Sequence, residues 1–312
     1  MKEFIISENE AGLTVIKYSS KILRKAPQSI IHKFIRNKNI ELNRKKCREG
    51  EILKAGDKVA FFLSDETFGK FSDIPGQTDS GASKCTLDIS RVLYEDEDYI
   101  FYDKPAGLIT QKDDSGRVSL NDQLLGYCGI NGVFRPSICN RLDTNTSGIV
   151  LCGKSIKGLQ RLNKAIKERR IRKSYRAVLW GRIEEEHMHL VSFIRPVDNE
   201  NMMEVSDTPG RGYKEIITDL KLIASDERYS YAELDLITGR KHQIRAQMAH
   251  IKHPVVGDIK YGREAEDKKA ADRQLLHAYR VELPEDILNG LTLYAPVPED
   301  IGRLADSIRG ND

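Results

Sequence analysis

The 312-residue sequence lacks several features, and each absence excludes a class of protein. Its five cysteines are odd in number, widely spaced and without a Cys-x-x-Cys pair, which excludes a disulfide framework and a zinc ligand set. The longest apolar run, residues 59–63, is far shorter than the roughly 20 residues of a membrane-spanning helix. The first residues carry carboxylates instead of the apolar segment of a secretory signal. We therefore expect a cytoplasmic protein that does not enter a membrane.

Motifs that bind nucleotides or metals are also missing. The sequence contains no Gly-x-x-x-x-Gly-Lys and no Gly-x-Gly-x-x-Gly that opens a helix, so we expect neither an NTPase nor a nicotinamide enzyme. His242, His250 and His253 lie close together, with Asp258 following, but their spacing matches neither His-Glu-x-x-His nor the deaminase pattern. We predict no metal site and interpret these histidines as structural or as facing RNA.

Positive charge is concentrated in two segments, although the net charge is only +3. Residues 13–60 contain thirteen Lys or Arg against four acids, and residues 154–173 contain nine against one. Residues 61–100 reverse the balance, with nine acids against three bases. A polyanion attracts such segments by releasing its counterions. Neither segment has the broad apolar face with Trp and Phe of a membrane-surface helix, so we expect a nucleic acid as partner.

Periodicity predicts an α+β fold with a mixed, largely antiparallel central sheet flanked by helices, together with a small N-terminal α/β domain. Apolar residues recur at helical spacing in 29–37 and, on a basic helix, in 155–170. They alternate, as in strands, at 40–42, 59–61, 175–180, 216–222 and 232–236. The change of charge marks residues 64–85 as a linker between a domain at 13–63 and a larger domain at 86–312.

The segment 13–63 resembles the small RNA-binding domain named after ribosomal small-subunit protein S-four. The resemblance rests on two short helices, an Asn-Arg-Lys turn, and Lys54-Ala55-Gly56-Asp57 before a final strand. It implies that the basic face of this domain binds structured RNA. The expected RNA-binding residues are Lys33, Arg36, Arg44, Lys45 and Lys46 here, with Lys164 and Arg169 in the second basic segment.

A polar loop at residues 140–146 leads directly into an apolar strand, which is an arrangement that can hold a reactive carboxylate on a rigid element. Taken alone, Asp143 is more often a turn or capping residue. However, Arg141-Leu142-Asp143-x-x-Thr146-Ser147-Gly148 is similar to the signature of the RluA-type pseudouridine synthases. The segments 96–107, 173–177, 236–258 and 275–278 resemble further motifs of that family in the same order.

The resemblance implies an enzyme of the pseudouridine synthase fold that isomerises uridines in structured RNA. It implies that Asp143 is the essential carboxylate, acting as nucleophile on the sugar or as base at C2′, with Tyr175 and Arg245 beside it. Arg141, Leu276, Lys173 and Thr146 become the expected substrate-binding residues. The resemblance implies no cofactor and no metal, and we expect a monomer. The appended RNA-binding domain favours ribosomal RNA of the large subunit over tRNA.

Five positions depart from the usual family pattern and bear on target choice more than on activity. Asn140 stands where His is usual, Lys241 where Thr is usual, and Asp103 where Asn is frequent, while Ala246-Gln247 replaces Val-His. Two other functions stay open at this point. One is a non-catalytic RNA-binding or ribosome-assembly factor; the other is a glycosidase or nucleoside hydrolase that uses paired carboxylates.

Overall fold

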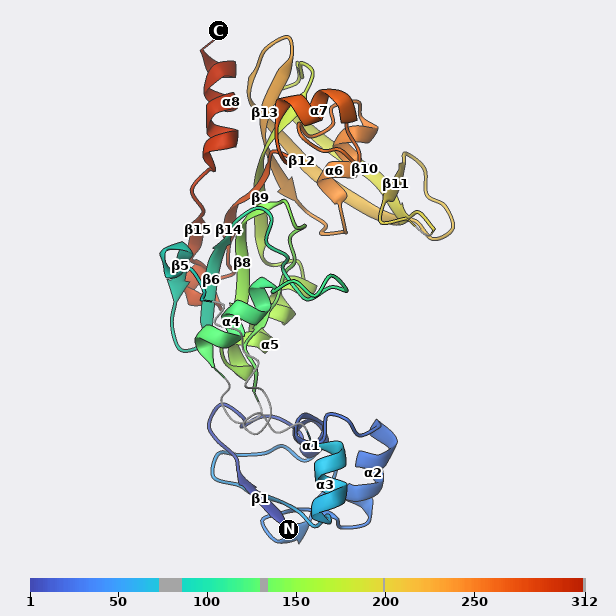
Figure 1. Cartoon of the computed structure of the whole chain (residues 1–312), viewed down its shortest axis with the longest axis vertical. Helices are drawn as coiled ribbons and strands as arrows, with labels where there is room; N and C mark the ends of the chain where they lie inside the picture. The colour runs from blue at the N-terminus through green and yellow to red at the C-terminus, as the bar shows by residue number, and fades with distance from the viewer. Residues whose placement is uncertain (73–85, 130–133, 199, 311–312) are drawn as a thin grey trace.

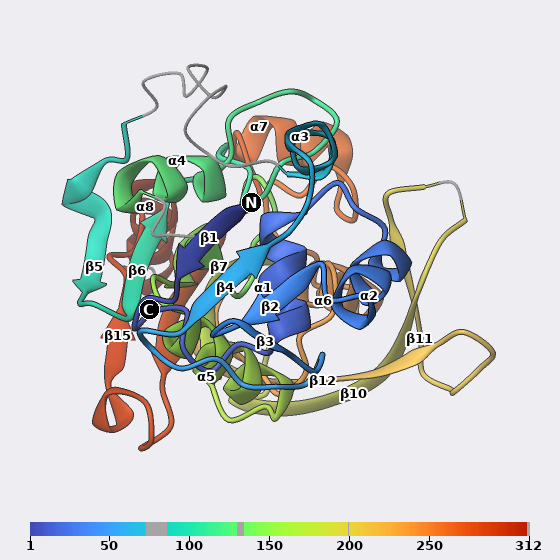
Figure 2. The same cartoon turned by 90° about the horizontal axis from the view of Figure 1, so that it is seen from below.

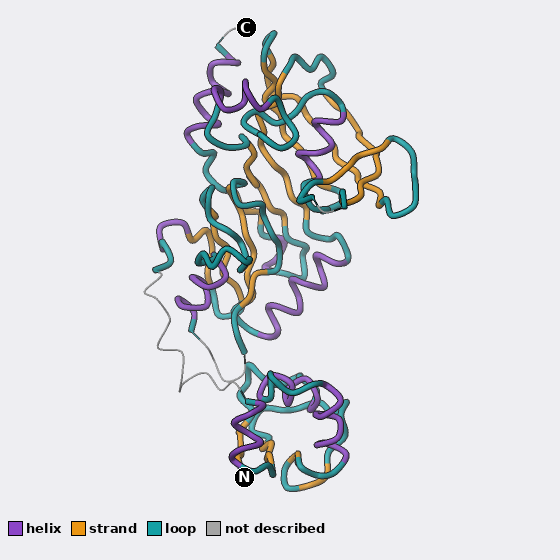
Figure 3. Tube along the Cα trace, turned by 45° about the vertical axis from the view of Figure 1, so that its right-hand side comes forward, coloured by secondary structure: helices purple, strands orange, loops and turns teal. Residues whose placement is uncertain are grey.

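Two β-sheets organise the chain, and the smaller one lies at the N-terminal end of the long axis (Figure 1). The computed structural model describes residues 1–72, 86–129, 134–198 and 200–310. The larger sheet is mixed and largely antiparallel, with helices on both sides (Figure 3), which confirms the predicted fold class. No helix in these described ranges combines the length and the apolar character that crossing a membrane requires.

The N-terminal unit (residues 1–72) holds an antiparallel sheet of order β1-β4-β2-β3 with three helices. Its elements are β1 (Lys2–Ile5), α1 (Val15–Ile22), α2 (Gln28–Arg36), β2 (Ile40–Leu42), β3 (Lys45–Lys46), β4 (Lys58–Phe61) and α3 (Asp65–Phe71). The predicted helix and both predicted strands are present. Asn43 and Arg44 both have positive φ, 51° and 63°, as the two-residue turn between β2 and β3 requires. This turn carries Arg44 and the lysines of β3 on an exposed hairpin.

The predicted boundaries of this unit, residues 13 and 63, are too narrow. Before residue 13, β1 pairs with β4, and after residue 63, α3 places Phe68 against the rings of Phe4 and Phe61 at 6.3 and 5.9 Å. Residues 64–71 are acidic and therefore resemble a linker in composition, but this aromatic contact makes them part of the core. The rest of the expected linker, residues 73–85, lies outside the described residues.

The larger sheet has the order β11-β10-β12-β13-β9-β14-β8-β6-β5, with β15 paired to β14 and β7 to β8. All described pairs in it are antiparallel except β8 with β14. The hairpin of β10 and β11 projects sideways from the rest (Figures 1 and 2). The strands are β5 (Val92–Glu95), β6 (Tyr99–Lys104), β7 (Ser137–Ile138), β8 (Ser147–Gly153), β9 (Arg172–Trp180), β10 (His187–Pro196), β11 (Met203–Ser206), β12 (Lys214–Ser225), β13 (Tyr229–Leu236), β14 (Leu276–Glu282) and β15 (Thr292–Tyr294).

Helices cover both faces of this sheet, so its central strands are buried on two sides. One face packs against α4 and α6 through residues such as Leu124 and Met248, and the other packs against α5 and α8 through Leu162 and Ile301. Every residue of β8 is buried, which fixes the loop that precedes it. The remaining helices are α4 (Leu120–Cys128), α5 (Ile156–Lys167), α6 (Gln243–His250), α7 (Glu264–Ala270), α8 (Glu299–Arg309) and the 3₁₀ turns at Ile89–Arg91 and Leu288–Gly290.

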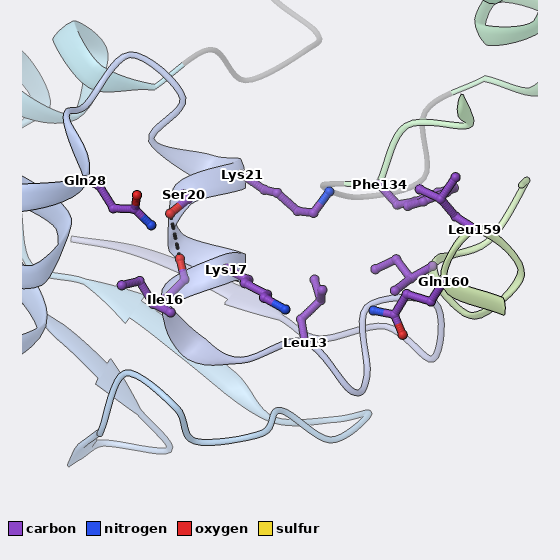
Figure 4. Close-up of a pocket in the computed structure, with 10 residues that line it drawn as sticks. Leu13, Ile16, Lys17, Ser20, Lys21, Gln28, Phe134, Leu159 and Gln160 are labelled. Atoms are coloured by element: carbon purple, nitrogen blue, oxygen red, sulfur yellow. Dashed lines mark hydrogen bonds between the residues drawn. The ribbon is translucent and has the colours of Figure 1, made fainter. Parts of the chain in front are cut away.

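The N-terminal unit meets the larger one where α1 faces the start of α5. Phe134 and Ile156 of the larger unit belong to the same apolar cluster as the N-terminal core, and Asn9 Oδ1 accepts the backbone N–H of Ile156 at 3.1 Å. A cavity of about 340 Å³ remains between the two units. Figure 4 shows Lys17 and Lys21 extending from α1 into it, and the Lys21 ammonium lies 5.9 Å from the Phe134 ring.

Candidate active site

A cavity of about 840 Å³ brings together most of the residues that the sequence analysis singled out. The loop before β8, the strand β9, the start of β14 and the N-terminal end of α6 form its walls. Cations outnumber acids along its lining, where the only carboxylates are those of Asp113 and Asp143. The lining cations are Lys112, Arg141, Lys173, Arg240, Lys241, Arg245 and Lys260. The cavity is therefore suited to a polyanion, with one carboxylate held among positive charges.

The loop that carries Asp143 is fixed by hydrogen bonds from two other parts of the chain. Thr110 donates from its hydroxyl to the Leu142 carbonyl at 2.7 Å, and Gly107 donates its N–H to the Thr144 carbonyl at 3.0 Å. Arg273 donates to the Asn145 carbonyl at 3.2 Å, and it also holds Asp300, at the start of α8, in a bidentate pair of 2.6 and 2.9 Å. The backbone on both sides of Asp143 is thus held in place.

Lys104 is a buried cation that adds to the hydrogen bonds holding this loop. Its side chain is fully buried, and its ammonium donates to the carbonyls of Pro105, Leu108 and Thr144 at 2.8–2.9 Å. Those three bonds use all three donors of the group. Burial lowers the pKa of Lys104 to about 7, with nearby Arg273 acting in the same direction. The carbonyls favour the charged form, so Lys104 positions the loop that carries Asp143.

Arg245 joins Asp143 to a second, buried carboxylate. One terminal nitrogen, Nη1, donates to Asp143 Oδ2 at 2.7 Å, while Nε and the other terminal nitrogen donate to the two oxygens of Asp258 at 2.6 and 2.9 Å. Burial opposes the charge of Arg245, but the two carboxylates outweigh it and raise its pKa. The Asp258 side chain is only 1% exposed, against 27% for Asp143. The buried carboxylate of Asp258 therefore holds Arg245 in place, and Asp143 stays accessible from the cavity.

Tyr175, Lys173 and Leu276 lie on adjacent strands that face this carboxylate. Tyr175 is almost fully buried, and burial, with Asp143 nearby, raises its pKa, so its hydroxyl keeps its proton at neutral pH. Lys173, two residues before it on β9, is half-buried, and burial lowers its pKa. Among the described residues, neither the Tyr175 hydroxyl nor the Lys173 ammonium has a hydrogen-bond or ion-pair partner. Both groups are thus available to a ligand.

The other two predicted substrate-binding residues, Arg141 and Thr146, differ in their exposure. Arg141 is exposed and lines the cavity, as expected. Thr146 also lines it, but its side chain is only 3% exposed and its hydroxyl accepts a bond from Gln274 at 3.4 Å. In this structure Thr146 therefore holds the loop more than it reaches into the cavity.

The predicted RNA-binding residues are all exposed. Five belong to the N-terminal unit and two to the region of α5. In the described part of the chain none of the seven forms an ion pair with an acid, so their charges are free to meet phosphates. They are Lys33, Arg36, Arg44, Lys45, Lys46, Lys164 and Arg169.

Sequence reasoning missed the roles of Asp258, His242 and Tyr261 at the site. His242 and Asp258 were weighed as metal ligands, and the histidine was interpreted as structural or as facing RNA, but neither residue was linked to Asp143. The described residues contain no group of three or more His, Cys, Asp or Glu that could hold a metal ion. Tyr261 accepts the N–H of Met203 and lies 2.8 Å from His242 Nδ1. The available signal was that these residues stand within or just beyond the segment 236–258.

The site does not fit a hydrolase that uses two carboxylates. Such an enzyme needs a second acid beside the first and open to substrate. Asp258 is the second acid beside Arg245, but it is buried and both of its oxygens accept bonds from Arg245. It is therefore not free to protonate a leaving group.

Comparisons with known proteins agree with the geometry. A family model described as RNA pseudouridylate synthase matches residues 98–250. The ribosomal large subunit pseudouridine synthase D of Escherichia coli is 30% identical over 98% of this chain and 94% of its own. An uncharacterized RNA pseudouridine synthase of Bacillus subtilis is 27% identical over 97% of this chain and 95% of its own. The solved human RNA pseudouridylate synthase domain containing 4 shares the fold at a TM-score of 0.58, with 20% identity over 70% of this chain and 93% of that one.

Proposed function

The chain belongs to the RNA pseudouridylate synthase family, and we propose that it modifies large-subunit ribosomal RNA with Asp143 as the essential carboxylate. The protein is an isomerase that converts uridine to pseudouridine in RNA. The observation that carries the assignment of the site is the Asp143–Arg245 contact of 2.7 Å at the wall of a cavity lined by cations.

The reaction breaks the bond between ribose C1′ and uracil N1, turns the base, and rejoins it through C5. N1 takes up a proton and the C5 hydrogen leaves as one, so no electron is gained or lost overall. The target base must first leave the RNA stack, at a cost of a few kcal/mol. Contacts between remote phosphates and the basic residues of this chain offset that cost.

Each residue at the cavity has a role that its position supports. Asp143 acts at the sugar, and Arg245 compensates its charge. Tyr175 offers a ring against which uracil packs and a protonated hydroxyl that can exchange the C5 proton. Leu276 packs against the base from β14. Lys173 and Arg141 hold the flanking phosphates, or Arg141 fills the space that the extruded base leaves.

The N-terminal unit supplies the second part of the proposal. Lys33, Arg36, Arg44, Lys45 and Lys46 form its exposed basic face, and we assign them to RNA binding. The E. coli relative is named a ribosomal large subunit pseudouridine synthase and is similar over 94% of its length, which supports rRNA over tRNA here. We further propose that the protein acts as a monomer in the cytoplasm.

Release of tritium tests the substrate class. In vitro transcripts of large-subunit rRNA and of a tRNA pool, each labelled at uracil C5, are incubated with the protein. The proposal predicts release from the rRNA and little from the tRNA, followed by mapping of the modified position by chemical derivatisation and primer extension. Release from the tRNA alone would overturn the rRNA assignment. Binding without release from either RNA would favour an RNA-binding factor instead.

A further inference from the structure

His242 lies beside Asp143, yet the roles proposed above do not use it. Its Nε2 is 3.7 Å from Asp143 Oδ2, the same oxygen to which Arg245 donates at 2.7 Å. Among the described residues, none donates a hydrogen bond to the other oxygen, Oδ1. Two groups therefore face one carboxylate oxygen and leave the second without a protein partner.

The backbone of His242 indicates that this placement is specific. The residue has φ 55° and ψ 17°, in the left-handed region, and it immediately precedes α6 without forming a side-chain cap. A non-glycine residue adopts such a conformation at an energetic cost and keeps it only where its surroundings require it. Here the left-handed turn accompanies a side chain that is only 7% exposed and faces Asp143.

Tyr261 contacts the other ring nitrogen of His242. Its hydroxyl accepts the N–H of Met203 at 2.8 Å and lies 2.8 Å from Nδ1 of His242, where it can donate its own proton. An imidazole that accepts at Nδ1 carries its hydrogen at Nε2, the nitrogen that faces Asp143. Burial lowers the pKa of His242 to about 4; Arg245, Lys241 and Lys260 also disfavour its charge, and Asp143 favours it.

We propose that His242 is a positioning residue, fixed by Tyr261 as the Nε2–H tautomer, that holds Oδ2 of Asp143 together with Arg245 so that Oδ1 meets the nucleotide. This inference rests on the proposed function, because it names the reacting oxygen of that site. Tyr261 supports both groups, since its ring also lies 5.3 Å from the Arg245 guanidinium. The 3.7 Å contact is longer than a hydrogen bond. We expect it to shorten when substrate fills the cavity, because catalytic contacts in unliganded sites are often long.

Nitrogen NMR tests the tautomer without reference to activity. In the ¹⁵N-labelled protein, which has seven histidines, the signals of His242 are assigned by their loss in His242→Gln. The native protein should show a hydrogen-bearing Nε2 and a hydrogen-free Nδ1 between pH 6 and 8, and Tyr261→Phe should show both tautomers. A native His242 with its hydrogen at Nδ1, or one that is charged at pH 7, would overturn the proposal.

Kinetics test the positioning role. Tyr261→Phe should lower kcat for C5 tritium release roughly ten-fold and change KM for the RNA less than about two-fold, because only the alignment of Asp143 is affected. His242→Ala should lose at least as much, whereas His242→Gln should recover most of the activity, because its amide places an N–H where Nε2 stands. Tyr127→Phe is the matched control, since it removes an exposed hydroxyl that donates to Glu95 and lies outside the cavity lining.

These experiments distinguish a failure of the positioning role from a failure of the proposed function. Native kcat in both Tyr261→Phe and His242→Ala, or a His242→Gln variant no better than His242→Ala, would overturn the positioning role alone. A native protein that releases no tritium from any tested RNA would overturn the proposed function, and the positioning role with it. Thermal unfolding of each variant excludes loss of the fold as the cause of a lower kcat.

Discussion

Ser147 and His277 stand 130 residues apart in the chain, and Ser147 Oγ lies 2.9 Å from Nδ1 of His277. They are register partners in the parallel pair of β8 and β14, directly behind the loop of Asp143. His277 Nε2 donates to the carbonyl of Ala295 at 3.5 Å. The imidazole is fully buried, and burial lowers its pKa to about 4. A neutral histidine therefore lies at the parallel pair of β8 and β14.

Acid should destabilise the protein through its buried histidines. The folded-state pKa values of His277 and His242, both about 4, lie below the ordinary 6.5. The unfolded chain therefore binds protons first, and the free energy of unfolding falls as pH drops from about 6.5 to 4, by at most about 1.4 kcal/mol per pH unit for each histidine. Urea unfolding at pH 7, 5.5 and 4.5 measures this. His277→Asn should reduce the slope and the exposed control His187→Gln should not; equal slopes in all three proteins would contradict the prediction.

Gly148→Ala should disrupt the pairing of β8 with β14. Gly148 has φ 111°, and a Cβ there would lie 2.2 Å from the backbone oxygen of Ala278. The added methyl group has no space, so we expect a loss of more than about 3 kcal/mol of stability. Gly69→Ala in α3 meets nothing within 4 Å and should stabilise by up to about 1 kcal/mol. Chemical unfolding of both variants measures these changes in stability. A Gly148→Ala protein of native stability would contradict the close approach of the Gly148 and Ala278 backbones.

Arg245→Met should destabilise the fold as well as abolish activity. The change leaves the buried carboxylate of Asp258 without its bidentate partner, which costs about 3–5 kcal/mol. The same change in an Asp258→Asn background should cost much less, because no buried charge is left unpaired. A double-mutant cycle from urea unfolding measures the difference. Additive effects would mean that the two residues are not coupled.

Charge removal on the N-terminal unit should weaken RNA binding in a salt-dependent way. Each of Lys33, Arg36, Arg44, Lys45 and Lys46, changed singly to Gln, should reduce the slope of log K against log salt by about one where that residue contacts a phosphate. Arg303→Gln is the control, since Arg303 lies on α8 at the far end of the molecule and pairs with Glu299 at 2.8 Å (Figure 1). Native slopes in all five variants would remove this face from the RNA-binding surface.

Local patterns allowed much of the fold to be predicted. The helix near residues 29–37 has strong periodicity because one face of it is buried. The strand 175–180 is apolar at most positions because β9 is buried on both faces. By contrast, β1 has four residues, too few to show alternation, and α3 is acidic enough to resemble a linker. Composition cannot show that Phe68 completes an aromatic core, because that contact depends on the position of β1.

The site was predictable where a motif names a residue and not where distant segments meet. The motifs identified Asp143, Tyr175 and Arg245, which the structure brings to one cavity. The bidentate Asp258 contact and the left-handed backbone of His242 depend on tertiary packing. The Arg273 contact with Asn145 joins residues 128 positions apart, and no local pattern encodes it.

We propose that the carboxylate of Asp143 performs the isomerisation, and the release of tritium by Asp143→Asn tests this role. Asparagine keeps the shape and still offers Arg245 an oxygen, so RNA affinity should stay within about two-fold of native while release from C5-labelled rRNA falls to background. Binding is measured by filter retention at the same salt concentration. Native protein that releases tritium beside an Asp143→Asn variant that does not is the predicted result. An Asn variant that turns over at the native rate would contradict the account.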